Sequence, residues 1–495
     1  MPAPRVIIIG AGAGGLSAAI DLARQGVAVT VLEGAAAVGG KMHRREAGPA
    51  SVDAGPTVLT MRWVFDELFS DAGATLDSCL TLHPADLLAR HAWSASERLD
   101  LFADVKASAD AIGALAGRAE AAGYREFVAR AQRMFRTLDG PFMRAPRPTA
   151  LSLAAATGLS QIWGIAPFAT MWKALGQHFR DPRLQQLFGR YATYSGSSPF
   201  AAPATLMVIA HVEQCGVWLP EGGMTGLAEA MAGLARRLGA EIRLDAPVAG
   251  IVVQGGRARG VTLASGERLE ADAIICNADA AALATGLLGP GATAAVPQPD
   301  PGGRSLSAVT WCLSAVTDGF PLTRHNVFFS RAYQAEFDEI FSRRRLPTEP
   351  TVYVCAQDRG GPSDVAGGAP EALLILINAP AIGDQHAFTQ VEIDACATRT
   401  FRLLEHCGLT VRRQPEMTVV STPAWFAKRF PATGGALYGQ AVHGAMAAFS
   451  RPGARSKIPG LYLAGGSVHP GPGVPMAVLS GRLAASALMA DRTSR

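Results

Sequence analysis

The sequence lacks the features that would support a disulfide framework, a metal centre or a nucleic-acid interface. Its seven cysteines are scattered along 495 residues with no Cys-x-x-Cys pair, and its ten histidines show no metal-ligand spacing. The cysteine pattern favours a reducing cytoplasm, and we expect no bound metal. Charged residues make up only 17% of the chain, and 45 basic against 41 acidic residues leave a net charge of +4. A charge balance so weak and mixed does not predict a nucleic-acid partner.

An uncharged stretch, residues 148–172, is long enough to consider as a membrane element. It lies between Arg147 and Lys173, but two prolines, two glycines and Gln161 within it oppose a helix that spans the bilayer. We predict that it forms buried helices of a small domain. Docking of this stretch into one membrane leaflet is the second alternative, and a helix that spans the bilayer is the least favoured. No signal peptide precedes the first expected strand, at Val6, so the expected location is the cytoplasm.

The N-terminal residues carry a dinucleotide-binding pattern. The β-branched run Val6–Ile9 is typical of a buried parallel strand, and it leads into a glycine-rich loop and then a helical pattern. A second strand pattern ends in Glu33, at about the spacing from the loop at which an acidic residue binds the adenosine ribose. The loop residues expected at the pyrophosphate are Gly10, Gly12, Gly14 and Gly15.

Two further turns extend this pattern beyond a simple nucleotide motif. Gly-Gly-Lys ends at Lys41, and Asp-Ala-Gly-Pro-Thr ends at Thr57. This arrangement resembles the extended fingerprint of flavoproteins of the amine-oxidase and carotenoid-desaturase superfamily, which implies FAD as the cofactor. Lys41 stands where the family usually has arginine, so the positive charge is kept but the bidentate fork is lost. The resemblance places Gly40, Lys41, Gly55, Pro56, Thr57 and Val248 at the FAD, the last through a backbone contact with adenine.

A glycine- and proline-rich stretch near the C-terminus, residues 465–475, is predicted to hold the cofactor with main-chain groups. A short strand pattern precedes it and a helical pattern follows, so the dipole of a second helix N-terminus would stabilise negative charge on a reduced flavin. His469, within the stretch, is the weak candidate for a catalytic base, although bracing the turn is the favoured interpretation. The expected cofactor contacts from this region are Gly465, Gly466, Gly473, Val474 and Met476.

The same stretch resembles the phytoene-dehydrogenase signature of the carotenoid desaturases, with departures at Val468 and Pro472. The resemblance covers essentially the whole chain, and residues 54–65 are most similar to the branch that acts on 1-hydroxylated acyclic carotenoids. It implies an FAD-dependent enzyme that introduces a C3–C4 double bond into 1-hydroxy- or 1-methoxy-neurosporene-type substrates of spheroidene-pathway carotenoid biosynthesis. The substrate contacts that we expect are Arg62, Trp63 and Phe65.

The family resemblance also implies partners. They are a hydrophobic carotenoid, a quinone or oxygen as electron acceptor, and a membrane surface. The expected attachment is peripheral, to the inner or photosynthetic membrane.

Two alternatives stay open at this point. One is a phytoene desaturase or another flavoenzyme of the amine-oxidase superfamily, although no aromatic residue lies between Gly465 and Met476, where amine oxidases usually place one. The other is a non-catalytic, prenyl-binding escort protein of the same fold, which the intact glycine loop and Glu33 oppose.

The expected fold class is α/β, with more than one domain because a chain of this length exceeds one hydrophobic core. A Rossmann-type FAD-binding domain, amine-oxidase- or glutathione-reductase-like, is interleaved with a mixed-sheet substrate domain and a helical lid. The expected boundaries are 1–70, 218–285 and 425–495 for the FAD domain, 71–110 and 286–424 for the substrate domain, and 111–217 for the lid.

Overall fold

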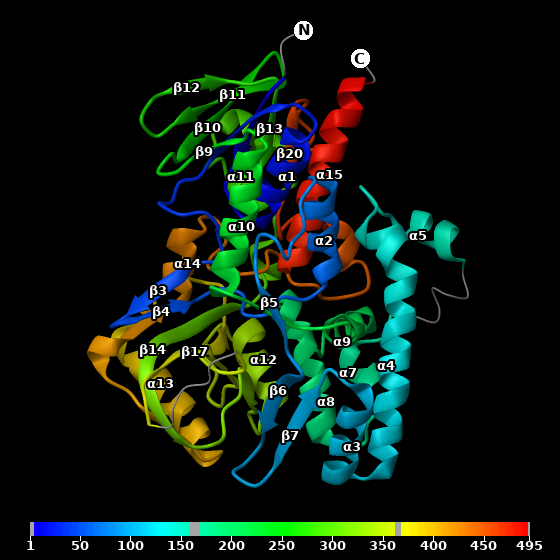
Figure 1. The fold of residues 1–495 in the computed structure, drawn as a ribbon, viewed down its shortest axis with the longest axis vertical. Helices are drawn as coiled ribbons and strands as arrows, with labels where there is room; N and C mark the ends of the chain where they lie inside the picture. The colour runs from blue at the N-terminus through cyan, green and yellow to red at the C-terminus, as the bar shows by residue number, and fades with distance from the viewer. Residues whose placement is uncertain (1–3, 159–167, 362–367, 494–495) are drawn as a thin grey trace.

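The computed structural model describes residues 4–158, 168–361 and 368–493. A parallel sheet of five strands occupies one end of the molecule (Figure 1). Its strands, in spatial order, are β20 (Leu461–Leu463), β13 (Ala273–Cys276), β1 (Arg5–Ile9), β2 (Ala28–Leu32) and β9 (Glu241–Arg243). This mixed α/β architecture confirms the expected fold class.

The two faces of this sheet are covered by different elements, and the alternation along β1 shows how. Val6 and Ile8 pack toward the helices α1 (Ala13–Ala23), α10 (Gly223–Arg237) and α15 (Val474–Thr493). Ile7 and Ile9 pack instead with residues of a small antiparallel sheet on the other side. Since side chains alternate along a strand, the four-residue apolar run fills two cores at once. The small sheet consists of β10 (Val248–Gln254), β11 (Arg257–Leu263) and β12 (Arg268–Glu270).

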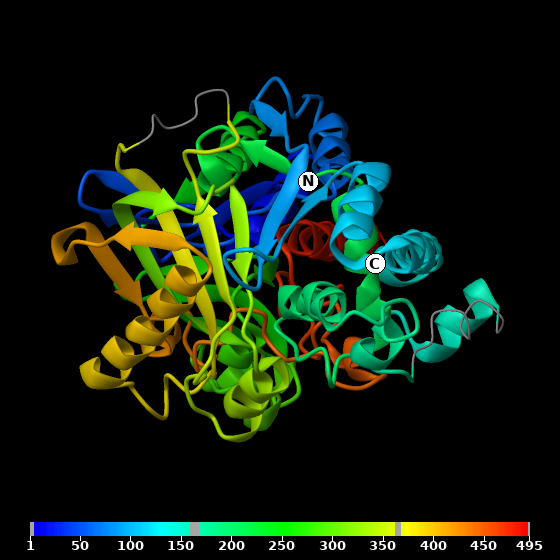
Figure 2. The ribbon, with the colours of Figure 1, turned by 90° about the horizontal axis from the view of Figure 1, so that it is seen from below.

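A second large sheet forms the other half of the molecule. It is mostly antiparallel, with one parallel pair, β15–β6, and β19 (Thr418–Ser421) paired beside β14. Its seven strands along the main path are β18 (Leu409–Arg412), β14 (Ser307–Gly319), β17 (Glu371–Ala379), β16 (Val352–Ala356), β15 (His325–Phe328), β6 (Leu87–Ala92) and β7 (Arg98–Phe102). Helix α13 (Gln390–His406) covers one face, and the helices between residues 105 and 214 lie on the opposite side (Figure 2).

Those helices share a core built on aromatic side chains. Phe127 and Tyr124 of α4 contact Phe188 of α8, with ring centroids 4.8 and 5.6 Å apart, and Phe179 stacks on Phe188 at 4.9 Å. The helices of this group are α3 (Val105–Ala116), α4 (Arg118–Leu138), α5 (Ala150–Thr157), α7 (Met171–Leu175), α8 (Pro182–Gly189) and α9 (Val208–Gln214).

Helix α5 lies at the edge of the molecule and reaches this core through Leu153 (Figure 1). Leu153 is its only buried residue, and Leu151 is 80% exposed. The prediction of buried helices over 148–172 is therefore wrong for α5, because of its apolar side chains only Leu153 is buried in the helical core. Residues 159–167 lie outside the described residues. Of the helices in the described ranges, none is long and apolar enough to cross a membrane.

The strands and helices expected from the sequence are otherwise found close to their predicted positions. The run expected to begin at Val6 forms β1, and the strand pattern expected to end at Glu33 forms β2. The helix expected after residues 465–475 is α15, which begins within that stretch at Val474 and continues to Thr493.

Candidate cofactor and substrate site

The glycine loop lies at the carboxyl end of the parallel sheet, where β1 is flanked by β2 on one side and β13 on the other. Chains that leave adjacent parallel strands in opposite directions open a crevice at this point. A Cβ on Gly15 would lie 2.0 Å from the Gly10 carbonyl oxygen, and Gly10 itself has φ of 95°. Helix α1 begins at Ala13 with no side-chain cap and no acidic residue in its first turn. Its N-terminus is thus available to an anionic group.

Asn277, which directly follows β13, closes this loop from the side. Its Nδ2 donates to the Gly10 carbonyl oxygen at 3.3 Å. A Cβ on Gly12 would lie 2.9 Å from that nitrogen, and a Cβ on Gly14 would lie 2.6 Å from Oδ1. The sequence reasoning missed Asn277 as a site residue. Its position at the carboxyl end of a strand next to β1 is the signal that would have found it.

Glu33, at the end of β2, already makes two hydrogen bonds to the backbone. Its Oε2 accepts from the Ala11 N–H at 2.7 Å and its Oε1 accepts from the Ala35 N–H at 2.9 Å. These bonds fix the carboxylate beside the glycine loop, and its remaining lone pairs can accept from ribose hydroxyls. Val248 begins β10 close by, two residues after Ala246, whose N–H donates to the Glu33 carbonyl oxygen at 2.8 Å.

The second and third motifs pack against the first. Gly39 pairs with Gly12 in an isolated parallel bridge, and a Cβ on Gly40 would lie 3.3 Å from the Gly12 Cα. A Cβ on Gly55 would lie 1.9 Å from the Lys41 carbonyl oxygen. The Lys41 Nζ donates to the Leu437 carbonyl oxygen at 2.6 Å, and burial lowers its pKa. Lys41 therefore ties this turn to the C-terminal part of the chain.

The C-terminal stretch completes the arrangement. Gly465 (φ 109°) lies against Asn277, and its backbone N is 2.9 Å from where a Cβ on Gly14 would be. Helix α15 then begins at Val474, so the N-termini of α1 and α15 lie on the same side of the sheet. The glycines of these loops therefore let the segments pack closely against one another and against Asn277. We call the loops 10–15, 39–41, 55–57 and 465–476 together the cradle.

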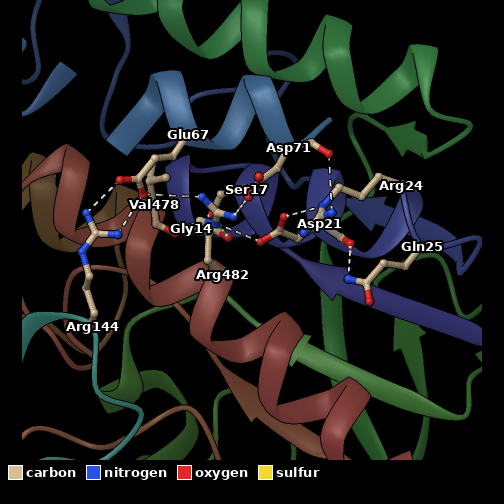
Figure 3. A network of polar contacts seen from close by, with 10 residues as sticks. All are labelled: Gly14, Ser17, Asp21, Arg24, Gln25, Glu67, Asp71, Arg144, Val478 and Arg482. Carbon is tan, nitrogen blue, oxygen red and sulfur yellow. Dashed lines mark hydrogen bonds and ion pairs between the residues drawn. The ribbon is translucent and has the colours of Figure 1, made fainter. Parts of the chain in front are cut away.

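A polar network holds the helices of the cradle together (Figure 3). The Ser17 hydroxyl donates to the Val478 carbonyl oxygen at 2.9 Å, which joins α1 to α15. Arg482 of α15 pairs with Asp21 of α1 at 3.1 Å and also with Asp71 at the end of α2 (Arg62–Asp71). Since Asp21 is almost fully buried, this ion pair fixes α15 relative to α1.

His469 does not line the cavity described below. Its side chain is buried, its Nε2 contacts the Phe142 carbonyl oxygen at 2.9 Å, and burial lowers its pKa to about 4. A carbonyl only accepts, so Nε2 carries the proton and donates it. This geometry supports the bracing role, because His469 links the C-terminal stretch to the end of the lid helices.

An apolar cavity of about 370 Å³ opens beside the cradle, between the second sheet and the helices of residues 105–214. Thr57 and Gly473 line it from two different loops of the cradle, and Met476 lines it from α15. Other apolar lining residues are Val58, Leu138, Phe142, Leu206, Val208, Ile209, Val212, Leu374 and Leu376. Such a volume and lining are typical of a pocket for an apolar ligand.

The three residues expected at the substrate lie elsewhere. Phe65 is fully buried in the core of the parallel-sheet domain, and Trp63 packs edge-on against Phe135. Arg62 pairs with Asp77 at 2.5 Å and stacks over Trp218. The chain turns into α2 after Met61, which carries these side chains away from the cavity. The preceding residues, Thr57, Val58, Thr60 and Met61, line it instead.

Comparison with known proteins identifies a family for this chain. The model of the flavin containing amine oxidoreductases matches residues 13–489. The chain belongs to this family. It is therefore an oxidoreductase with a flavin, and an escort protein without catalytic activity is not supported.

The similar proteins include carotenoid desaturases and a solved oxidoreductase structure. The chain is 52% identical to a hydroxyneurosporene desaturase of Rubrivivax gelatinosus, over 99% of this chain and 94% of that protein. It is 30% identical to a 1-hydroxycarotenoid 3,4-desaturase of a Flavobacterium species, over 97% of this chain and 98% of that protein. An oxidoreductase structure from Methanosarcina mazei shares the fold, with a TM-score of 0.63, 15% identity and coverage of 98% and 100%. The resemblance to carotenoid desaturases is confirmed.

Proposed function

We propose that this oxidoreductase is an FAD-dependent desaturase of acyclic carotenoids, which introduces the C3–C4 double bond into 1-hydroxy- or 1-methoxy-neurosporene-type substrates. The observation that carries the proposal is the cavity itself. An apolar space with Leu374 and Ile209 in its walls also has Thr57 and Met476 of the cradle among its lining residues. A hydrocarbon chain can thus lie with one end against the cofactor position. The names of the two relatives support the substrate class.

The cradle fits FAD in two respects. Two helix N-termini, those of α1 and α15, point to the same side of the sheet, which suits a diphosphate and the electron-rich edge of a flavin. Glycines also stand where any Cβ would collide with backbone, as at Gly15 and Gly55. We infer that Glu33 binds the ribose, that the loop 10–15 binds the diphosphate, and that residues 473–476 approach the ring system.

Desaturation removes a hydride equivalent and a proton from two adjacent carbon atoms. A bound flavin supplies the acceptor for the hydride equivalent. The task left to the chain is orientation of the substrate and exclusion of water, and apolar walls serve both. The one carboxylate among the lining residues, Glu213, is held in place by two tyrosine hydroxyls. Both of its oxygens accept hydrogen bonds, from the hydroxyls of Tyr191 (2.6 Å) and Tyr194 (2.8 Å).

Turnover by the purified flavin-loaded protein tests the proposal. Incubation with 1-hydroxyneurosporene should give a pigment with one more conjugated double bond, which is visible as a red shift of absorbance. Phytoene, offered in parallel, should be left unchanged. Turnover of phytoene alone would replace the proposed reaction with that of a phytoene desaturase. The electron acceptor would be identified by supplying a quinone or oxygen separately, under otherwise anaerobic conditions, and measuring which of them sustains turnover.

We further propose that helix α5 attaches the protein to a membrane surface, from which a carotenoid would enter. Leu151 of α5 is 80% exposed and Phe168, after the undescribed residues, is 78% exposed. Arg147 precedes the helix and Lys173 follows the segment, as expected for a surface that meets anionic headgroups.

Leu151→Glu should release the protein from anionic vesicles in a flotation assay and leave turnover of detergent-solubilised carotenoid unchanged. Val391→Glu is the matched control, because Val391 is equally apolar at the surface, 78% exposed, but lies on α13. Equal flotation of wild type and Leu151→Glu would refute docking through α5.

A further inference from the structure

One arginine in the cavity wall makes a single long hydrogen bond. Arg190 follows α8 directly and lines the cavity. Its Nη1 makes a long hydrogen bond of 3.4 Å to the Tyr194 hydroxyl. Across the described ranges, Arg190 forms no ion pair with a carboxylate, and the nearby Glu213 is occupied by two tyrosine hydroxyls. A guanidinium has five N–H donors, so most of those of Arg190 are left for a ligand.

Arg451, the other arginine among the lining residues, differs from Arg190 because its guanidinium donates three hydrogen bonds. It donates to the carbonyl oxygens of Gln440 (2.7 Å), Gly466 (3.2 Å) and Tyr438 (3.3 Å). Arg451 therefore holds the loops around the cradle. The contrast indicates that Arg190 is not placed for the same structural purpose, since burying a cation without acceptors is unfavourable.

Aromatic rings keep the Arg190 guanidinium in place. Its Cζ lies 5.3 Å from the ring centroid of Tyr353 and 5.4 Å from that of Tyr194. Such cation–π contacts hold the charge in an apolar wall without using its hydrogen-bond donors. Arg190 is thus positioned by stacking, and its N–H groups stay available to the cavity.

The position of Arg190 relative to the cradle is specific. The Tyr353 hydroxyl, from the ring beneath Arg190, lies 2.7 Å from the Thr57 hydroxyl oxygen. Thr57 belongs to the cradle loop that follows Gly55. Arg190 is therefore separated from Thr57 of the cradle by one tyrosine side chain.

We propose that Arg190 donates a hydrogen bond to the oxygen on C1 of the carotenoid and so selects substrates with an oxygenated end. The inference rests on the proposed function. The oxygen on C1 is three covalent bonds from C3, which limits their separation to about 4 Å. If the C3–C4 bond is held at the flavin, the oxygen on C1 must lie close to the cradle, where Arg190 can donate to it. Hydroxyl and methoxy oxygens both accept, whereas a hydrocarbon end group leaves the buried cation unpaired.

The test compares two substrates in three variants. The purified flavin-loaded wild type, Arg190→Met and Arg190→Lys are each given 1-hydroxyneurosporene and neurosporene, which lacks the oxygen. Arg190→Met should lower kcat/KM for the hydroxylated substrate by about 10- to 100-fold, the usual cost of losing a hydrogen bond to a charged group. Its effect on neurosporene should be less than about threefold. Arg190→Lys keeps one charged donor and should recover part of the preference.

Two controls make the outcome decisive. Flavin absorbance and the Tm report whether each variant is folded, and Ile209→Met alters the same cavity wall without touching a polar group. An equal loss on both substrates in Arg190→Met, with flavin retained, would overturn the inference about Arg190. A wild type that desaturates neither substrate would overturn the proposed function instead. If Arg190→Met does not fold, an unchanged substrate preference in Arg190→Lys and in Arg190→Gln would likewise overturn the inference.

Discussion

The cradle and the cavity meet at Thr57 and Met476, yet they are built in different ways. The cradle is made of backbone, with glycines wherever a Cβ would collide, such as Gly15 and Gly55. The cavity is made of side chains from elements far apart in sequence, such as Ile209 of α9 and Leu374 of β17. The first kind of site leaves a local sequence signature, and the second leaves almost none.

This difference predicts different responses to mutation. A change in the cradle displaces backbone and should affect cofactor and fold together. A change in the cavity alters one wall and should affect substrate while the flavin stays bound. The following experiments test that division, from the largest expected effect to the smallest.

Gly15→Ala should abolish flavin binding. The added Cβ would lie 2.0 Å from the Gly10 carbonyl oxygen, which is backbone and cannot move without opening the loop. We expect colourless protein and a loss of about 3 kcal/mol in the free energy of unfolding. Gly140→Ala is the matched control, because no atom lies within 4 Å of its added Cβ. Normal flavin absorbance in Gly15→Ala would contradict the description of the cradle.

Acidification should weaken the second sheet, which borders the cavity. Burial lowers the pKa of His91 to about 3 and that of His325 to about 3, from an ordinary value of 6.5. Between these values the unfolded chain binds more protons than the folded chain, so stability falls as pH drops from about 6.5 toward 4. The Tm should decrease steadily from pH 7 to pH 5. His325→Gln should make this decrease less steep, and an unchanged Tm over that range in the wild type would contradict the prediction.

Arg482→Met tests whether the polar network holds the cradle together. The change leaves the buried carboxylate of Asp21 with only the half-exposed Arg24 as an ionic partner. We expect a loss of about 2 kcal/mol in stability and weaker retention of flavin on dilution. Lys106→Met breaks the fully exposed pair with Asp110 and should change neither quantity measurably. Equal effects of the two substitutions would show that the network does not fix α15.

Tyr353→Phe probes the boundary between the two regions. The Tyr353 hydroxyl lies 2.7 Å from both the Thr57 hydroxyl and the His325 Nδ1. Its removal should cost about 1 kcal/mol in stability, because two buried polar atoms lose a partner. Flavin should remain bound, since the backbone of the cradle is untouched. Loss of flavin in this variant would show that the cradle depends on the cavity wall.

Sequence reasoning was most successful where function resides in the backbone. The strand at Val6, the glycine loop and Glu33 are consecutive or nearly so, and the hydrogen bonds of Glu33 to Ala11 and Ala35 are local to that motif. Asn277 was missed because it contacts this loop from the end of the neighbouring strand β13, which is remote in sequence. Its role follows only from the pairing of β13 with β1.

The substrate side could not be predicted in the same way. Arg62, Trp63 and Phe65 follow the cradle motif in sequence, but the left-handed backbone at Met61 (φ 50°) and the start of α2 redirect them into other contacts. The 148–172 stretch likewise looked like a buried element from composition. An apolar helix is buried only if another element packs on it, and amino-acid composition does not predict which elements pack together.

The sequence by itself determined the fold class, the family and the close packing of the glycine loops of the cradle, because glycine spacing and strand periodicity are local constraints on the backbone. Tertiary structure alone decided which side chains form the cavity, that His469 braces a turn, and that Arg190 lines the cavity and makes a single long hydrogen bond. These features depend on distances between residues remote in sequence, such as Arg190 and Tyr353, and such distances exist only once the sheet and the lid have packed together.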